Sequence, residues 1–138
     1  MCLSAARRRG LRILLGAAAA CLAAGCRPPE EAPEIDLSWT VAPHPPMAGP
    51  ATFSLTLTDA TTGKPLSGAA VRLEADMSHA GMEPVFAAAR EVGPGLYEAP
   101  LELTMAGDWL VLVDATLRDG RTLQRRLELR GVRARGKP

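Results

Sequence analysis

WLVLVDATLRDGRTLQRRLEL, residues 109–129, contains two apolar runs joined by a turn sequence. In the first run both faces are apolar from Trp109 to Val113, which is typical of a strand in the interior of a sheet. Asp119-Gly120 is a strong signal for a two-residue hairpin turn. In the second run Leu123, Leu127 and Leu129 share one face and polar residues the other, as in an edge strand. This stretch therefore predicts an antiparallel β-hairpin.

The same two-residue period recurs along the chain before this hairpin. The expected strands, about seven in all, are 35–41, 53–59, 71–77, 85–90, 96–105, 109–117 and 122–130. Turns rich in glycine and proline separate them, and no stretch has the pattern of an amphipathic helix long enough to form alone. The sequence therefore predicts an all-β fold, an immunoglobulin-like β-sandwich of about seven strands.

The N-terminal segment has the parts of an export leader. Four arginines lie between residues 7 and 12, ahead of an apolar run from Ile13 to Ala20 that is short for a membrane span. Leu22-Ala23-Ala24-Gly25-Cys26 then resembles the bacterial lipobox. The resemblance implies a lipoprotein with a diacylglyceryl thioether on Cys26, an acyl chain such as palmitate on its amine, and permanent membrane anchoring. An ordinary secretory leader cut near Ala24 is the alternative.

We therefore expect four segments. A lipoprotein signal peptide covers 1–25, and the lipidated cysteine with a tether rich in proline and glutamate covers 26–34. The β-sandwich covers 35–130 and a basic tail covers 131–138, either as a solvated end or as a contact for acidic phospholipid headgroups. The expected location is the bacterial cell envelope, facing the periplasm. Arg27, where an inner-membrane retention signal has aspartate, weakly favours the outer membrane.

The numbers of cysteines and charged residues limit the functions expected of the mature domain. Cys2 and Cys21 leave with the leader and Cys26 carries lipid, so the mature domain has no disulfide. Without the four leader arginines, 12 basic residues stand against 15 acidic residues, a formal charge of −3. A nucleic acid is therefore not an expected partner. With no free thiol, two histidines and no serine in a nucleophile elbow, we expect no enzymatic activity and no catalytic residue.

MSHAGM, residues 77–82, brings two thioethers and an imidazole together. Thioether sulfur is a soft ligand that selects copper(I), and imidazole also binds copper. Met77 and His79 point the same way in extended backbone, and Gly81 lets the chain turn so that Met82 joins them. These three side chains, Met77, His79 and Met82, are the predicted metal ligands. The further candidates, from neighbouring loops, are Met105, His44 and Met47.

The same residues also have a plainer interpretation. Met77 and Met105 share the parity of buried positions, so each is also expected to fill a gap in the core. His79 in a loop is then simply solvated. Trp39 and Trp109 are expected in the core, and the sequence shows no motif for an organic cofactor.

Several motifs together resemble the YtkA-like domain, a family close to FixH and to domains attached to copper-efflux proteins. They are Met77 to Met82 followed by Glu83-Pro84-Val85, Gly95-Leu96-Tyr97, and Met105-Ala106-Gly107-Asp108-Trp109. The resemblance covers about Thr40 to Leu129. It implies an extracytoplasmic immunoglobulin-like sandwich associated with copper handling or oxidase assembly. It also implies that Met105 and Trp109 serve as scaffold.

Two functions are therefore expected. The first is a lipid-anchored extracytoplasmic domain that binds or delivers copper(I) through the Met/His loop, with a membrane transporter or an oxidase assembly protein as partner. The second is a metal-free protein-interaction module, or an envelope lipoprotein, that binds such a partner.

Overall fold

The computed structural model describes residues 34–79 and 81–136 of the 138-residue chain. The chain divides into two units, Met1–Glu30 and Glu31–Pro138, and the described residues all belong to the second. The expected leader, the lipidation site at Cys26 and the tether up to residue 33 lie outside the described residues. Within the described part, no helix is long and apolar enough to cross a membrane.

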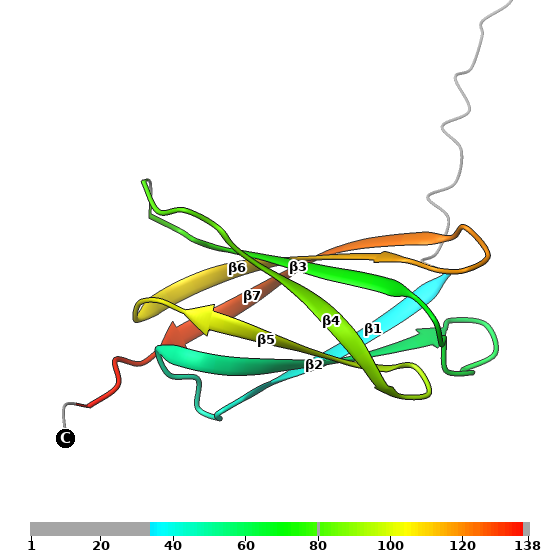
Figure 1. Cartoon of the computed structure of the whole chain (residues 1–138), viewed down its shortest axis with the longest axis horizontal. Helices are drawn as coiled ribbons and strands as arrows, with labels where there is room; N and C mark the ends of the chain where they lie inside the picture. The colour runs from blue at the N-terminus through cyan, green and yellow to red at the C-terminus, as the bar shows by residue number, and fades with distance from the viewer. Residues whose placement is uncertain (1–33, 80, 137–138) are drawn as a thin grey trace, which may run out of the picture. The chain divides into compact units, whose positions relative to one another are not determined.

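Seven strands build the described part, which contains no helix. They are β1 (Ile35–Ala42), β2 (Gly49–Asp59), β3 (Ala70–Met77), β4 (Val85–Gly93), β5 (Leu96–Leu103), β6 (Gly107–Thr116) and β7 (Thr122–Val132). They are hydrogen-bonded in the order β1-β2-β5-β4-β3-β6-β7, and every neighbouring pair is antiparallel (Figure 1). The predicted all-β fold is therefore confirmed.

β4 joins the two layers of the sandwich. Its first part, 85–89, pairs with β3, and from Arg90 onward it pairs with β5. A register irregularity between Glu91 and Gly93 accompanies this change of partner, as bulges do where strands bend. One layer is therefore β1, β2 and β5, the other is β3, β6 and β7, and Figure 1 shows β4 crossing between them. β1 and β7 are left as the free edges of the two layers.

The core lies between the layers and follows from the alternation of side chains along each strand. Phe53, Leu55 and Leu57 of β2 are fully buried, as are Val111 and Val113 of β6. The buried apolar side chains of the described part all lie between Ile35 and Val132. Residues 34–136 therefore carry a complete core and are expected to fold without the leader.

Two apolar residues expected in the core are not fully enclosed. Met105 has an exposed fraction of 49% because β5 ends at Leu103, so the parity of that strand no longer applies two residues later. Trp39 is half-buried, with its ring stacked on that of Phe53 at a centroid distance of 6.1 Å. Because β1 is an edge strand, one side of the Trp39 ring has no neighbouring strand to cover it.

The basic tail begins later than its sequence indicates. β7 continues to Val132, whose side chain is buried. The Arg133 N–H then donates to the Pro46 carbonyl at 2.9 Å, and the Arg133 carbonyl accepts from the Ala48 N–H at 2.8 Å. The first residues of the expected tail are therefore paired with the proline-rich loop between β1 and β2.

Glu91 fastens two turns at the end of the sandwich where β1 begins. Its carboxylate accepts from the Gly68 N–H at 2.9 Å and from the Gly95 N–H at 3.3 Å. The hydrogen bond from Gly68, with a second from the Ser67 side chain, holds the pKa of the Glu91 carboxyl below its ordinary value. The ionised carboxylate is thus part of the folded structure.

Glu91→Gln is expected to flatten the acid side of the stability profile. A carboxyl whose pKa is lowered on folding stabilises the fold above its unfolded-state pKa, and that contribution is lost as the pH falls through the folded-state pKa. The ordinary pKa is 4.5, so the free energy of unfolding of the wild type should fall more steeply than that of Glu91→Gln from about pH 5 downward. Urea unfolding at successive pH values measures both slopes, and parallel profiles would contradict the prediction.

Candidate functional site

Three loops and the end of β7 lie at one end of the sandwich. The loops are 43–48 between β1 and β2, 78–84 between β3 and β4, and 104–106 between β5 and β6. The strand registers bring them together, because Gly49 pairs with Leu103, Met77 with Trp109 and Gly107 with Val132 (Figure 1). All six predicted metal ligands lie in these loops or at the strand end beside them, which we call the loop end.

Met77 is the last residue of β3 and is buried, with an exposed fraction of 7%. Its methyl group lies 3.0 Å from the position that a Cβ on Gly107 would occupy, so this glycine leaves room for the thioether. Met77 also lines a cavity of about 270 Å³ together with Trp109 and Asp108. It fills a gap in the core, as its parity predicts, while one side faces an opening at the surface.

The other two residues of the predicted ligand set are more accessible. The His79 side chain is exposed, and Met82 is half-buried against the edge of the core. Gly81 between them has a φ of +94°, a left-handed conformation in which the chain turns back toward β4. Nothing lies within 4 Å of the position that a Cβ on Gly81 would occupy, so the turn is open to solvent.

Met105 lies beside this group rather than in the core. The indole N–H of buried Trp109 donates to the Met105 carbonyl at 3.0 Å and fixes the backbone of the β5–β6 loop. The Ser78 N–H donates to the Asp108 carbonyl at 3.4 Å, which joins this loop to the residue after Met77. Met105 is therefore held near the end of β3 with its thioether exposed.

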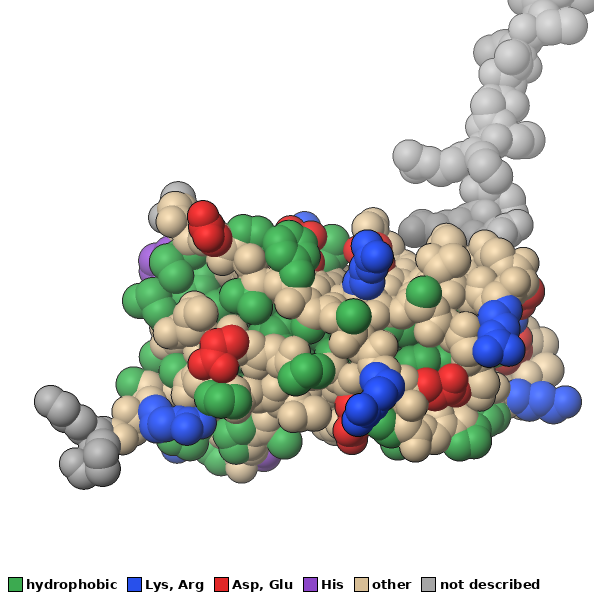
Figure 2. All heavy atoms as spheres, in the orientation of Figure 1, with side chains coloured by type: hydrophobic (Ala, Val, Ile, Leu, Met, Phe, Trp, Pro, Cys, Tyr) green, Lys and Arg blue, Asp and Glu red, His purple; other side chains and the backbone are tan. Residues whose placement is uncertain are grey.

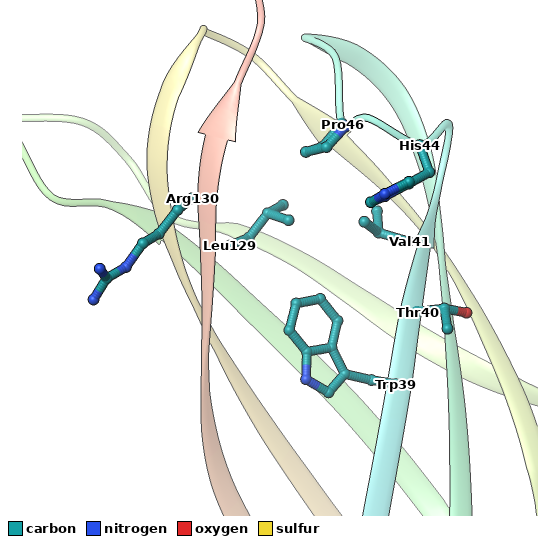
Figure 3. A pocket seen from close by; sticks show the side chains of 7 residues that line it. All are labelled: Trp39, Thr40, Val41, His44, Pro46, Leu129 and Arg130. Atoms are coloured by element: carbon teal, nitrogen blue, oxygen red, sulfur yellow. The ribbon is translucent and has the colours of Figure 1, made fainter.

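His44 and Met47 belong to a different part of the loop end. Met47 is half-buried and forms a parallel bridge with Arg133. His44 is exposed and lines a second cavity together with Trp39 and Leu129 (Figure 3). This cavity shares no predicted ligand with the one beside Met77. Figure 2 likewise shows the two histidine side chains at separate places.

The donor set at the loop end is mostly sulfur. Within residues 34–79 and 81–136, no three His, Cys, Asp or Glu side chains gather in a way that could hold a metal ion. The structure places Met77 at the end of β3, His79 and Met82 in the loop that follows it, and Met105 in the adjoining β5–β6 loop. Thioethers with one imidazole are soft donors, which suit copper(I) better than zinc or magnesium.

The sequence interpretation did not foresee the cavity that His44 and Trp39 share. It has a volume of about 470 Å³ and lies between β1 and β7, the two edges of the sandwich. One signal was present in the sequence, because Arg125 interrupts the apolar face of β7 between Leu123 and Leu127. An inward-facing charge of this kind is typical of an unpaired edge strand.

The described part is thus an all-β sandwich that carries thioether and imidazole side chains at one end. Residues 32–114, more than half of the chain, match the sequence model of the YtkA-like family. The chain belongs to the YtkA-like family, as its motifs indicated. Comparisons with curated proteins and with solved structures found no match. The matched residues end within β6, so β7 lies beyond them.

Proposed function

We propose that this protein is a lipid-anchored domain of the bacterial envelope that binds copper(I) at its loop end and delivers it to a membrane partner. The observation that carries the proposal is the position of Met77 at the end of β3, with His79 and Met82 in the loop that follows it and Met105 in the adjoining β5–β6 loop. Such donors match the softness of copper(I). The membrane anchor is the lipid expected on Cys26.

The accessibility of the donors supports binding by local rearrangement. His79 and Met105 are exposed, so their side chains can turn toward a metal ion without disturbing the core. Met82 is half-buried and Met77 is nearly enclosed, which gives the site one fixed thioether on a rigid strand. A site with one fixed donor and several mobile donors can both take up and release its ion.

The proposed site lies at the end of the sandwich opposite the first residue of β1. β1 begins at Ile35, which pairs with Asp59 at the far end of the sandwich, and it ends next to the loop end. The expected tether contributes at most about 3 Å per residue, and the eight residues of β1 add about 26 Å. The loop end is therefore suited to a partner, a membrane transporter or an oxidase assembly protein, that extends well out of the membrane.

A competition experiment tests copper binding. The chain from Arg27 to Pro138 is titrated without oxygen into a chromophoric copper(I) chelator. We expect it to withdraw about one ion per chain, and X-ray absorption at the copper edge should then show sulfur and nitrogen neighbours. A chain that leaves the copper(I) on the chelator over the whole titration would overturn the proposal.

The second candidate function is a metal-free module for binding a protein partner. The observation that favours it is the cavity of about 470 Å³ between β1 and β7, which none of Met77, His79, Met82 and Met105 lines. Cross-linking on cells separates the two functions. Capture of a specific partner that persists in a His79→Ala variant and under copper depletion supports the module, and copper-dependent capture contradicts it.

A further inference from the structure

The space between β1 and β7 is a seam with two free strand edges. Both strands end the order of the sheet, and they run parallel because six antiparallel pairings separate them. Main-chain bonds cross the seam at the loop end, between Arg133 and the residues Pro46 and Ala48. Elsewhere in the described part, β1 and β7 share no ladder. Unpaired edges of this kind offer hydrogen bonds to another strand.

An apolar groove follows this seam. Its volume of about 470 Å³ lies in the range of ligand-binding pockets. Figure 3 shows Trp39 and Val41 from β1 and Leu129 from β7 pointing into the gap, while Thr40 and Arg130 point away from it. The alternation of a β-strand thus presents apolar side chains to the groove and polar ones to solvent.

Basic residues are concentrated on β7 and the chain after it. Residues 122–136 contain five arginines and one acidic residue, Glu128, a formal charge of +4. Residues 34–121 contain five basic and twelve acidic residues, a formal charge of −7. Glu128 pairs with Arg130, and within the described part no carboxylate lies within ion-pair distance of the other four arginines. These four are Arg125, Arg126, Arg133 and Arg135. The β7 edge is therefore a basic strip on an acidic domain.

Arg125 makes this edge selective. It occupies an inward-facing position between Leu123 and Leu127 and is half-buried. An inward charge on an edge strand opposes indiscriminate pairing, because an apolar strand laid against it would bury the charge without a partner. A strand that brings a carboxylate on its inward face, opposite Arg125, removes this penalty.

We propose that the β7 edge is a docking site for an extended segment of a partner protein whose outward face is acidic and whose inward face is apolar except for one carboxylate opposite Arg125. The segment adds a strand to the β3-β6-β7 layer, and its apolar side chains cover Trp39, Val41 and Leu129. Its outward carboxylates lie beside Arg126 and Arg130 and its inward carboxylate lies beside Arg125, where cross-strand pairs of opposite charge stabilise the sheet. Main-chain bonds supply affinity and the side chains supply specificity. This site is independent of copper binding.

The probe is a short fluorescent peptide of alternating valine and glutamate in which one inward valine is also replaced by glutamate, added to the chain from Arg27 to Pro138 with a copper chelator present. We expect saturable binding with a change in tryptophan emission, since Trp39 lies in the groove. The same peptide with methylated amide nitrogens should not bind, because it cannot donate main-chain hydrogen bonds. A valine–lysine peptide should not bind either, because its charge matches that of the β7 edge. Equal binding of the native and methylated peptides would overturn strand addition.

Charge reversal locates the site. The double variant Arg125→Glu/Arg126→Glu should weaken peptide binding by at least about tenfold. The matched control, Arg72→Glu/Arg90→Glu, reverses two exposed arginines on β3 and β4 and should leave affinity unchanged. Thermal unfolding checks that both variants fold. Equal losses in the two variants would overturn the assignment to β7. The proposal would also be overturned if the chain did not bind the peptide but bound anionic phospholipid vesicles through the β7 arginines.

Discussion

Gly95→Ala is expected to destabilise the domain by about 2–4 kcal/mol. Gly95 lies in the turn between β4 and β5 with a φ of +69°, a left-handed conformation that side chains disfavour. A Cβ added there would lie 2.8 Å from the Leu57 carbonyl oxygen and 2.8 Å from the Pro65 Cβ. Both neighbours belong to packed backbone or a rigid ring, so the turn must shift. Urea unfolding of the chain from Arg27 measures the loss.

Gly63→Ala is the matched control for this prediction. Gly63 has nearly the same φ, +71°, but nothing lies within 4 Å of the position of its Cβ. Its substitution should therefore cost only the left-handed strain, about 1 kcal/mol. The difference between the two variants isolates the steric term. Equal destabilisation of both variants would show that the close approach at Gly95 relaxes without cost.

The Gly-x-Tyr motif that resembled the YtkA-like family has a structural role. The Gly95 carbonyl accepts from the Leu57 N–H at 2.9 Å, which holds the turn against β2. The hydroxyl of fully buried Tyr97 donates to the Leu66 carbonyl at 2.7 Å and accepts from the Ala69 N–H at 3.0 Å. Burial raises the pKa of the Tyr97 phenol, so the hydroxyl keeps its proton. The motif fastens the loop before β3, at the end opposite the predicted donors.

The strands themselves could be predicted because alternation is a local property of the sequence. Leu55, Leu73 and Val111 are buried as the two-residue period requires. Met105 is exposed because β5 ends at Leu103, two residues earlier. The local sequence pattern does not mark that end, so it assigns Met105 the parity of the buried residues in β5. Trp39 is half-buried because of an open seam that forms only when β1 and β7 become the two ends of one sheet. Features that depend on which distant strands meet are not encoded in a local pattern.

For the candidate site, too, the sequence predicted the local cluster but not the contacts between distant parts of the chain. The cluster from Met77 to Met82 is contiguous in sequence, so its position at a strand end could be inferred. Met105 lies beside this cluster because β3 pairs with β6, which aligns Met77 with Trp109. His44 and Met47 lie apart from the other predicted ligands because their loop pairs with Arg133. Sequence spacing alone does not report either contact.

The variant Met77→Leu/His79→Ala/Met82→Leu is expected to lose copper(I) affinity by more than about a hundredfold, 2.7 kcal/mol. Leucine keeps the volume of each methionine but removes the sulfur, so the core around Met77 should lose less than about 1.5 kcal/mol. Met105→Leu alone should weaken binding by about tenfold, since Met105 is held beside the end of β3 by the hydrogen bond from Trp109. Chelator competition measures each affinity.

The matched control is His44→Ala/Met47→Leu, which removes one imidazole and one thioether from the same end of the sandwich. His44 lines the seam cavity and Met47 pairs with Arg133, so their loop is held against the end of β7, whereas the loops of the proposed ligands are joined through Ser78 and Asp108. We therefore expect the affinity for copper(I) to stay within about twofold of the wild type. A large loss in this variant would mean that the β1–β2 loop moves to join the site. In that case metal binding and the closed end of the β1–β7 seam would be coupled, because the loop that supplies the ligands is the one that Arg133 holds in place.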